Sequence, residues 1–214
     1  MLIRWHGHAC FEIGDGNDLT IVTDPHDGKS IGIKPPVVKG DIVLMSHNHF
    51  DHNCARVVST SGTEVITGPG EKTAKGIKIR GVHSYHDEAS GSKRGENIIF
   101  KFEIEGVKLC HLGDLGEQLD NDQLAELGEI DVLFIPVGGT FTLDPADAWQ
   151  AIKAIKPKVV VPMHYRVGGL SLSIQPVENF LAKADKSAIV KVGNEIELTK
   201  DDLPEKQEVW VFSL

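Results

Sequence analysis

The sequence has few cysteines and no long apolar run. Its three cysteines, Cys10, Cys54 and Cys110, are an odd number at spacings that match neither a disulfide framework nor a zinc knuckle. The apolar runs are far too short to cross a bilayer, and the N-terminus lacks the charged start and apolar core of a signal peptide. We therefore expect a cytoplasmic protein with buried thiols and no membrane partner.

Positive charge is also scarce. The chain has 22 basic and 31 acidic residues, which gives a net charge of −9. This surplus works against sequence-independent binding to nucleic acid or to anionic membrane, so we expect a small-molecule substrate and no nucleic-acid partner. Linkers, low-complexity tracts and short-period repeats are absent too, and the sequence therefore predicts one domain over residues 1–214.

Strand patterns dominate the first half of the chain. Alternating or continuous apolar segments, separated by Gly, Asn, Asp and Pro, predict strands over 2–13, 18–24, 41–46, 63–67, 76–85, 97–105 and 107–112. The first segment alternates along its whole length. It predicts a single strand whose polar face carries His6, His8 and Cys10, an arrangement that resembles half of a metal site.

After residue 112, helical patterns alternate with apolar strands. Helices are expected over 120–128, 144–155 and 176–184, the second with Asp144 as N-cap and Pro145 in its first turn. Strands are expected over 130–139, 158–164 and 208–213. The chain is therefore predicted to be a mixed α/β protein.

The strongest functional signal is "MSHNHFDHN" at residues 45–53. Immediately after an apolar strand, His47, His49, Asp51 and His52 bring four ligand-type side chains into six residues. Crowded imidazoles and carboxylates lose solvation and repel one another unless a positive charge binds them. We therefore predict a divalent metal site, in which His47 and His49 chelate one ion while Asp51 and His52 face a second.

This His-x-His-x-Asp-His run resembles the signature of the metallo-β-lactamase superfamily. The segment "HLGD" at 111–114 resembles the one that gives the family's bridging aspartate, here Asp114. The segment "VVVPMHY" at 159–165 resembles the strand whose terminal histidine, here His164, binds the second metal. The "GHA" near the N-terminus, "TDP" at 23–25 and "PVGGTFTLDP" look closest to the lactonase-like branch of predicted zinc-dependent hydrolases. The resemblance implies a four-layer αββα sandwich.

One expected ligand has two candidates. The family has a histidine between the first motif and the aspartate, and "GVHSYHDEASG" offers His83 and His86, which would face opposite ways on one strand. His86 is favoured because it lies at the end of the apolar stretch, where related branches place an aromatic residue followed by histidine.

The resemblance then implies a dinuclear site. One metal is expected on His47, His49 and His86, the other on Asp51, His52 and His164, with Asp114 between them. Zinc suits these ligands, and manganese, iron or nickel would also be accepted. Two close cations lower the pKa of a bridging water, so a metal-bound hydroxide would attack a carbonyl or phosphorus centre while Asp51 orients it or accepts its proton. Family members that use iron for redox chemistry carry a glutamate where this chain has His49, which favours hydrolysis.

Other polar residues are expected around the metals. Asp24 is either a turn residue or an acceptor for the N–H of a metal-bound histidine. His8 is expected to line the site, His111 is either a structural hydrogen-bonding residue or a site residue, and Arg166 could meet an anionic substrate. Lys93 and Arg94 are alternatives for that last role.

The predicted activity is metal-dependent hydrolysis of an ester, lactone or phosphodiester bond in a small molecule. A nuclease acting on RNA or DNA is the enzymatic alternative, although the compact, acidic chain lacks room for the clamp insertion of RNA-processing relatives. From a different class, the chain could be a metal-binding sensor module without turnover.

Overall fold

Two β-sheets pack face to face in the computed structural model, which describes residues 1–16, 19–140 and 142–214. The six-stranded sheet has the order β13-β1-β2-β3-β4-β5. Its strands are β1 (Leu2–Trp5), β2 (Phe11–Gly14), β3 (Thr20–Thr23), β4 (Ile42–Leu44), β5 (Glu64–Ile66) and β13 (Glu195–Glu197). Residue 18, at which the expected second strand begins, lies outside the described residues.

The eight-stranded sheet has the order β12-β14-β11-β10-β9-β8-β7-β6. Its strands are β6 (Gly70–Ala74), β7 (Ile77–Tyr85), β8 (Glu96–Ile104), β9 (Val107–His111), β10 (Val132–Pro136), β11 (Val159–Met163), β12 (Ile189–Lys191) and β14 (Glu208–Val211). Strands β9, β10 and β11 run parallel to one another, as do β3, β4 and β5 of the other sheet. The short peripheral strands β6, β12 and β13 were not predicted.

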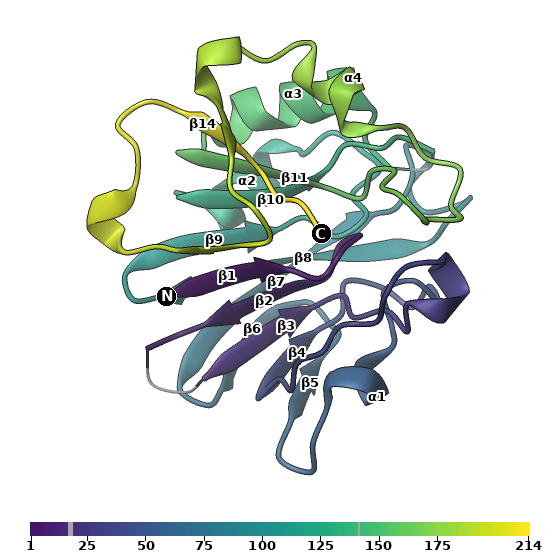
Figure 1. Cartoon of the computed structure of the whole chain (residues 1–214), viewed down its shortest axis with the longest axis vertical. Helices are drawn as coiled ribbons and strands as arrows, with labels where there is room; N and C mark the ends of the chain where they lie inside the picture. The colour runs from purple at the N-terminus through teal and green to yellow at the C-terminus, as the bar shows by residue number, and fades with distance from the viewer. Residues whose placement is uncertain (17–18, 141) are drawn as a thin grey trace.

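Helices cover the outer faces of both sheets. Helices α3 (Pro145–Ile155) and α4 (Val177–Leu181) lie beyond β10 and β11, and the short α1 (Ala55–Val58) lies on the far side of β4 and β5 (Figure 1). Helix α2 is Asn121–Leu127. The order helix, sheet, sheet, helix confirms the predicted α/β sandwich. Among the described residues, no helix is long and apolar enough to cross a bilayer.

Local sequence explains the helix boundaries. The carboxylate of Asp144 accepts hydrogen bonds from the backbone N–H groups of Ala146 and Asp147 at 2.7 and 2.9 Å, so it caps α3 as predicted. Asp120 and Gln123 form a reciprocal capping box at the start of α2. Between the sheets, Phe11 of β2 meets Phe134 of β10 with ring centroids 4.5 Å apart, and all three cysteines are buried.

The prediction of one strand over residues 2–13 is wrong. Strands β1 and β2 form an antiparallel hairpin in which Ile3 pairs with Ile13 and Trp5 with Phe11. The chain turns between them because Gly7 and His8 adopt φ angles of 92° and 55°, and the N–H of Cys10 donates to the carbonyl of Gly7 at 3.0 Å. Paired apolar residues still share one buried face, which is why the alternation looked continuous across the turn.

Candidate metal centre

The predicted metal ligands meet at one edge of the sandwich. This edge holds the carboxyl ends of the parallel strands β4, β9 and β11 and the end of β7, so the loops that leave them converge. The side chains brought together there are His47, His49, Asp51 and His52 after β4, His86 after β7, Asp114 after β9, and His164 after β11.

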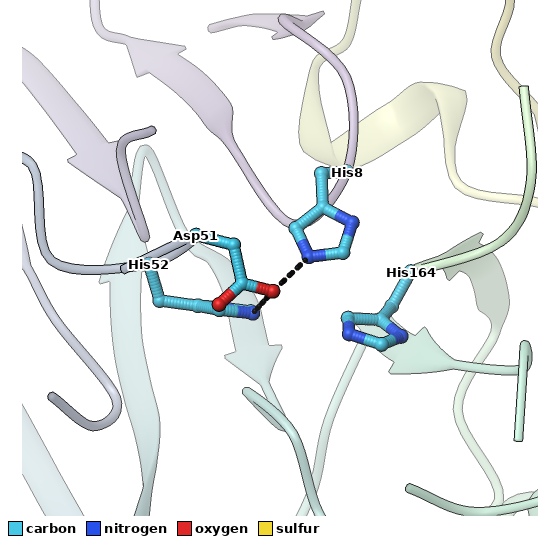
Figure 2. Close-up of side chains that lie close together, drawn as sticks. All are labelled: His8, Asp51, His52 and His164. Atoms are coloured by element: carbon cyan, nitrogen blue, oxygen red, sulfur yellow. Dashed lines mark hydrogen bonds and ion pairs between the residues drawn. The ribbon is translucent and has the colours of Figure 1, made fainter. Parts of the chain in front are cut away.

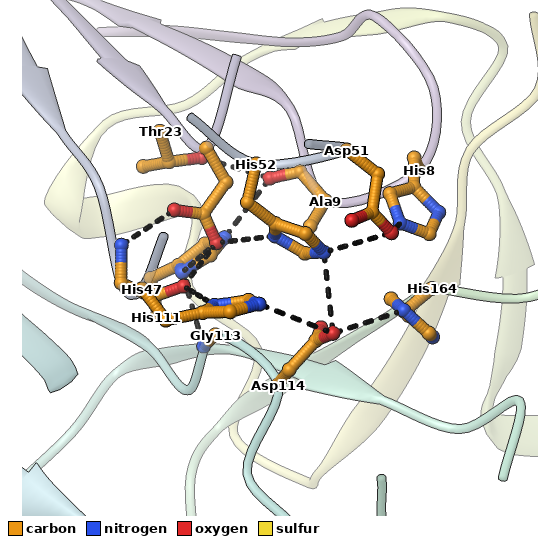
Figure 3. A network of polar contacts seen from close by, with 12 residues as sticks. His8, Ala9, Thr23, His47, Asp51, His52, His111, Gly113, Asp114 and His164 are labelled. Carbon is orange, nitrogen blue, oxygen red and sulfur yellow. Dashed lines mark hydrogen bonds and ion pairs between the residues drawn. The ribbon is translucent and has the colours of Figure 1, made fainter. Parts of the chain in front are cut away.

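Asp114 lies at the centre of this set. Its Oδ2 atom is 3.1 Å from Nε2 of His164, 3.2 Å from Nε2 of His52 and 3.2 Å from Nε2 of His86, and 3.7 Å from Nε2 of His47. Figure 3 shows the contacts from His47, His52 and His164 converging on this carboxylate. One oxygen thus faces imidazoles from several loops.

Two groups of ligand atoms flank Asp114, and the atoms of each group lie within 4.8 Å of one another. The trihistidine group consists of His47, His49 and His86. The aspartate group consists of His8, Asp51, His52 and His164, all of them buried (Figure 2). A third group, Asp24, His47 and His52, overlaps both of these. The first two groups contain the residues predicted for each ion, with His8 in addition, and the number of ions stays a prediction.

The unsatisfied atoms of the centre fit a cation. Among the described residues, Nε2 of His47, Nε2 of His52 and Oδ1 of Asp114 are buried and make no hydrogen bond. Buried polar atoms without a partner are costly and need an explanation. Imidazole nitrogens and carboxylate oxygens are ligands of divalent transition metals, so the donor set fits such an ion.

The protonation states of three of these residues suit metal binding. Burial, followed by the nearby His52, lowers the pKa of His47 to about 3, and burial with the nearby His164 lowers that of His8 to about 3. Burial disfavours the charged form of Asp114, but His164 and His52 outweigh this and hold its pKa well below the usual range. His47 and His8 are therefore neutral and Asp114 is ionised at neutral pH. At His52 burial disfavours the charged form, but Asp114 and Asp24 outweigh this and raise its pKa well above the usual value, so His52 must lose a proton to bind a metal ion.

Asp24 forms hydrogen bonds that orient the histidines of the centre. Its Oδ2 atom accepts hydrogen bonds from Nδ1 of His52 at 2.9 Å and from the hydroxyl of Ser46 at 2.7 Å. The same hydroxyl lies 2.8 Å from Nδ1 of His47. Asp24 therefore orients one histidine directly and a second through Ser46, so that Nε2 of each ring points towards Asp114.

His8 reaches the centre from the turn between β1 and β2. Its side chain is fully buried, and Nε2 donates to Oδ2 of Asp51 at 3.0 Å. Its ring centroid lies 4.2 Å from that of His164, whose backbone N–H donates to the carbonyl of His8 at 3.2 Å. The structure places His8 beside the predicted ligands, whereas His6 lies 2.8 Å from Glu12, away from the centre.

Three non-glycine residues of this region have positive φ angles. The values are 55° for His8, 37° for Asp24 and 52° for His164. Such backbone conformations cost about 1–3 kcal/mol each and cluster at functional sites. The fold holds these residues in strained conformations that aim their side chains at the centre.

The structure brings His86, and not His83, to the centre. The His83 side chain is 39% exposed, and its Nε2 atom lies 3.4 Å from Oε1 of Glu96. It therefore contacts a surface carboxylate and not the centre. His86 follows the last residue of that strand, and its backbone N–H donates to the carbonyl of Gly95 at 3.0 Å, which closes the loop between β7 and β8.

Neither His111 nor Arg166 belongs to the two groups of ligand atoms. Both ring nitrogens of His111 are used inside the fold: Nε2 donates to the carbonyl of Ala9 at 3.0 Å and Nδ1 accepts from the N–H of Gly113 at 3.2 Å. Arg166 is exposed, and it is not among the residues that line the cavity over the centre, whereas Arg94 is.

Sequence reasoning missed two supporting residues. Ser46 connects Asp24 to His47, and the side chain of Asn97 accepts a hydrogen bond from the backbone N–H of Asp114 at 2.9 Å. Gly113 allows this approach, because a Cβ there would lie 2.4 Å from Oδ1 of Asn97. The available signal for Ser46 was its place directly before the histidine run; Asn97, in the middle of an ordinary strand pattern, gave none.

Known proteins match this chain closely. The family described as "Beta-lactamase superfamily domain" matches residues 2–164. A UPF0173 metal-dependent hydrolase from Thermoplasma acidophilum is 30% identical over 185 residues, which are 76% of this chain and 82% of that protein. Another from Thermococcus onnurineus is 29% identical over 222 residues, with 92% of this chain and 99% of that protein covered.

A solved structure agrees over the whole length. A protein from Thermotoga maritima, described as a Zn-dependent hydrolase of the metallo-β-lactamase superfamily, is 41% identical with a TM-score of 0.81. The match covers 99% of this chain and 97% of that one. These findings confirm the resemblance seen in the sequence: the chain belongs to the metallo-β-lactamase superfamily and, with these relatives, to its metal-dependent hydrolases.

Proposed function

We propose that this hydrolase holds two divalent ions, zinc by preference, one on each group, with Asp114 between them. The observation that carries the proposal is the single oxygen of Asp114 that faces four imidazole nitrogens, from both groups, at 3.1 to 3.7 Å. Manganese, iron and nickel share the same ligand preferences, so metal analysis must decide the element. The proposed substrate is a small molecule with an ester, lactone or phosphodiester bond, and the proposed compartment is the cytoplasm.

Two bound ions lower the pKa of a water molecule towards neutrality and stabilise negative charge on the substrate oxygen. Asp51 is the proposed catalytic side chain. Burial opposes its ionisation, but the nearby His52, with Nε2 3.5 Å from Oδ2, and the hydrogen bond from His8 outweigh burial and hold the pKa of Asp51 far below its usual value. The ionised carboxylate would orient the attacking water by accepting its hydrogen bond and would accept its proton. As the water oxygen bonds to the carbonyl carbon or phosphorus, the bond from that atom to the ester oxygen breaks, and the leaving oxygen takes up this proton to depart as an alcohol.

Metal content and turnover, measured together, test the proposal. Protein loaded with zinc, and separately with manganese, is assayed on p-nitrophenyl esters, a lactone and bis-p-nitrophenyl phosphate after its bound metal has been quantified. Two ions per chain with turnover of one of these substrates support the proposal. Two ions without turnover on the whole panel would favour a metal-binding module, and salt-sensitive binding and cleavage of RNA would favour a nuclease.

A further inference from the structure

A cavity of about 340 Å³ opens directly over the metal centre. Its floor includes His49, Asp51, His86, Asp114 and His164. This volume lies at the low end of the range of small-molecule sites, so the cavity fits a compact substrate better than a polymer. The rest of its lining includes apolar side chains, which lie beside these polar residues.

One wall is formed by an exposed aromatic side chain. Phe50 stands between His49 and Asp51 in the sequence, lines the cavity, and is 55% exposed. A large apolar side chain in the middle of a ligand-bearing loop contributes little to the core at this exposure. Apolar side chains that face water beside a polar floor mark ligand-binding surfaces.

A second apolar part of the lining is carried by the loop between β11 and α4. Leu172, Ser173 and Ile174 of this loop line the cavity, and Ile174 is buried. Ile174 packs with Ile31 and Leu170 in a small apolar cluster, against which Leu172 also packs. The wall is therefore an ordered apolar surface.

Hydrogen bonds hold this loop in place. The N–H of Ser171 donates to the carbonyl of Ile31 at 2.9 Å, and the hydroxyl of Thr140 donates to the carbonyl of Ser173 at 2.9 Å. Because the wall is fixed before a ligand arrives, a substrate group that fits it loses little binding energy to ordering the loop.

Positive charge in the cavity is limited. Arg94 is the one lysine or arginine among the described residues that line it, and Asp51 and Asp114 are acidic. Polyanionic substrates such as oligonucleotides are held by several cationic side chains. Apart from the proposed metal ions, the side chains of the lining therefore supply one positive charge, which suits a substrate that is neutral or carries a single negative charge better than a polyanion.

We propose that the cavity selects an ester or lactone whose acyl or aryl group packs against Phe50 and Leu172, with the scissile carbonyl above the metal centre. The inference rests on the proposed function and adds to it the class of substrate, a compact molecule with an apolar part. A phosphodiester joined to polar groups would leave both apolar walls without a partner.

Chain length provides the test. With zinc-loaded protein, kcat/KM for p-nitrophenyl acetate, butyrate and hexanoate is expected to rise about three- to fourfold for each methylene that becomes buried. In Phe50→Ala and Leu172→Ala the loss is expected to grow with chain length, so that hexanoate suffers most. Val65→Ala, which shortens a 45% exposed valine of β5 outside this cavity, is the control and should keep the wild-type profile.

Calorimetric binding of acetate and hexanoate to the same loaded proteins gives a readout without turnover. Tighter binding of hexanoate in the wild type, and loss of that preference in Phe50→Ala, support the inference even if no ester on the panel is cleaved, an outcome that would count against the proposed function alone. Equal kcat/KM for acetate and hexanoate, equal binding of the two acids, or a preference for bis-p-nitrophenyl phosphate would overturn it. Thermal melts of the variants separate misfolding from lost recognition.

Discussion

The trihistidine group and the aspartate group differ in burial and in charge. All four members of the aspartate group are buried, whereas His47 and His49 of the trihistidine group are only partly buried. The aspartate group also contains its own carboxylate, Asp51, and one of its histidines is held directly by Asp24. A buried site with an anionic ligand and fixed rings binds a cation more tightly. We therefore expect two unequal sites, of which the trihistidine site exchanges its ion more readily.

The largest effect is expected from substitution of Asp114, which lies between the two groups. Asp114→Ala should release both ions and lower kcat/KM by about a thousandfold or more, because both sites share this carboxylate. Metal analysis after dialysis checks it, with Asp131→Ala as a control at a carboxylate bound by Lys108 and Lys200 instead. Retention of both ions in Asp114→Ala would show that the aspartate is not a ligand.

Separate substitutions in the two groups test their inequality. His49→Ala should lower the metal content from two ions to one and leave the tightly held ion, while His52→Ala should remove the tight ion. Titration of the metal-free variants with zinc is expected to show one strong site in the first and one weak site in the second. Equal affinities in the two variants would refute the proposed difference between the groups.

A smaller effect is expected from substitution of Asp24, which accepts a hydrogen bond from His52 of the aspartate group. Asp24→Asn keeps the size of the side chain but removes its charge, and it should weaken metal binding about 10- to 100-fold, as is typical for outer contacts of metal-bound histidine. The aspartate site should lose more affinity than the trihistidine site, because His52 contacts Asp24 directly and His47 does so only through Ser46. A competition titration with a chelator measures both constants.

The smallest effect on metal content is expected at His8. His8→Ala removes the hydrogen bond to Asp51, so kcat should fall about tenfold while both ions remain. His6→Ala, in the same turn but away from the centre, is the matched control. Loss of an ion from His8→Ala would instead make His8 a ligand of the aspartate group.

Sequence reasoning was most successful where ligands are close together in the chain. The run from His47 to His52 follows one strand, so its spacing alone indicates a shared site. Asp114 and His164 are far apart in the chain and were reached only through the family resemblance, since their proximity depends on parallel strands whose ends meet at one edge. His86 was favoured over His83 because the apolar stretch ends at Tyr85, which is also the last residue of β7.

Two features could not be predicted for physical reasons. The turn at Gly7 and His8 was hidden because apolar residues on both sides of it pair across the hairpin and keep an alternating pattern. The apolar wall at Leu172 and Ile174 lies in a loop without periodicity, and its orientation depends on packing against Ile31, which is distant in the chain. Tertiary contacts, and not local propensity, decide both.

The chain positions of the ligands bear on how the enzyme matures during synthesis. All three histidines of the trihistidine group have been translated once residue 86 is added, but His164 of the aspartate group follows 78 residues later (164 minus 86). During synthesis the trihistidine group is therefore complete first, and the aspartate group becomes complete only after β11 has been made.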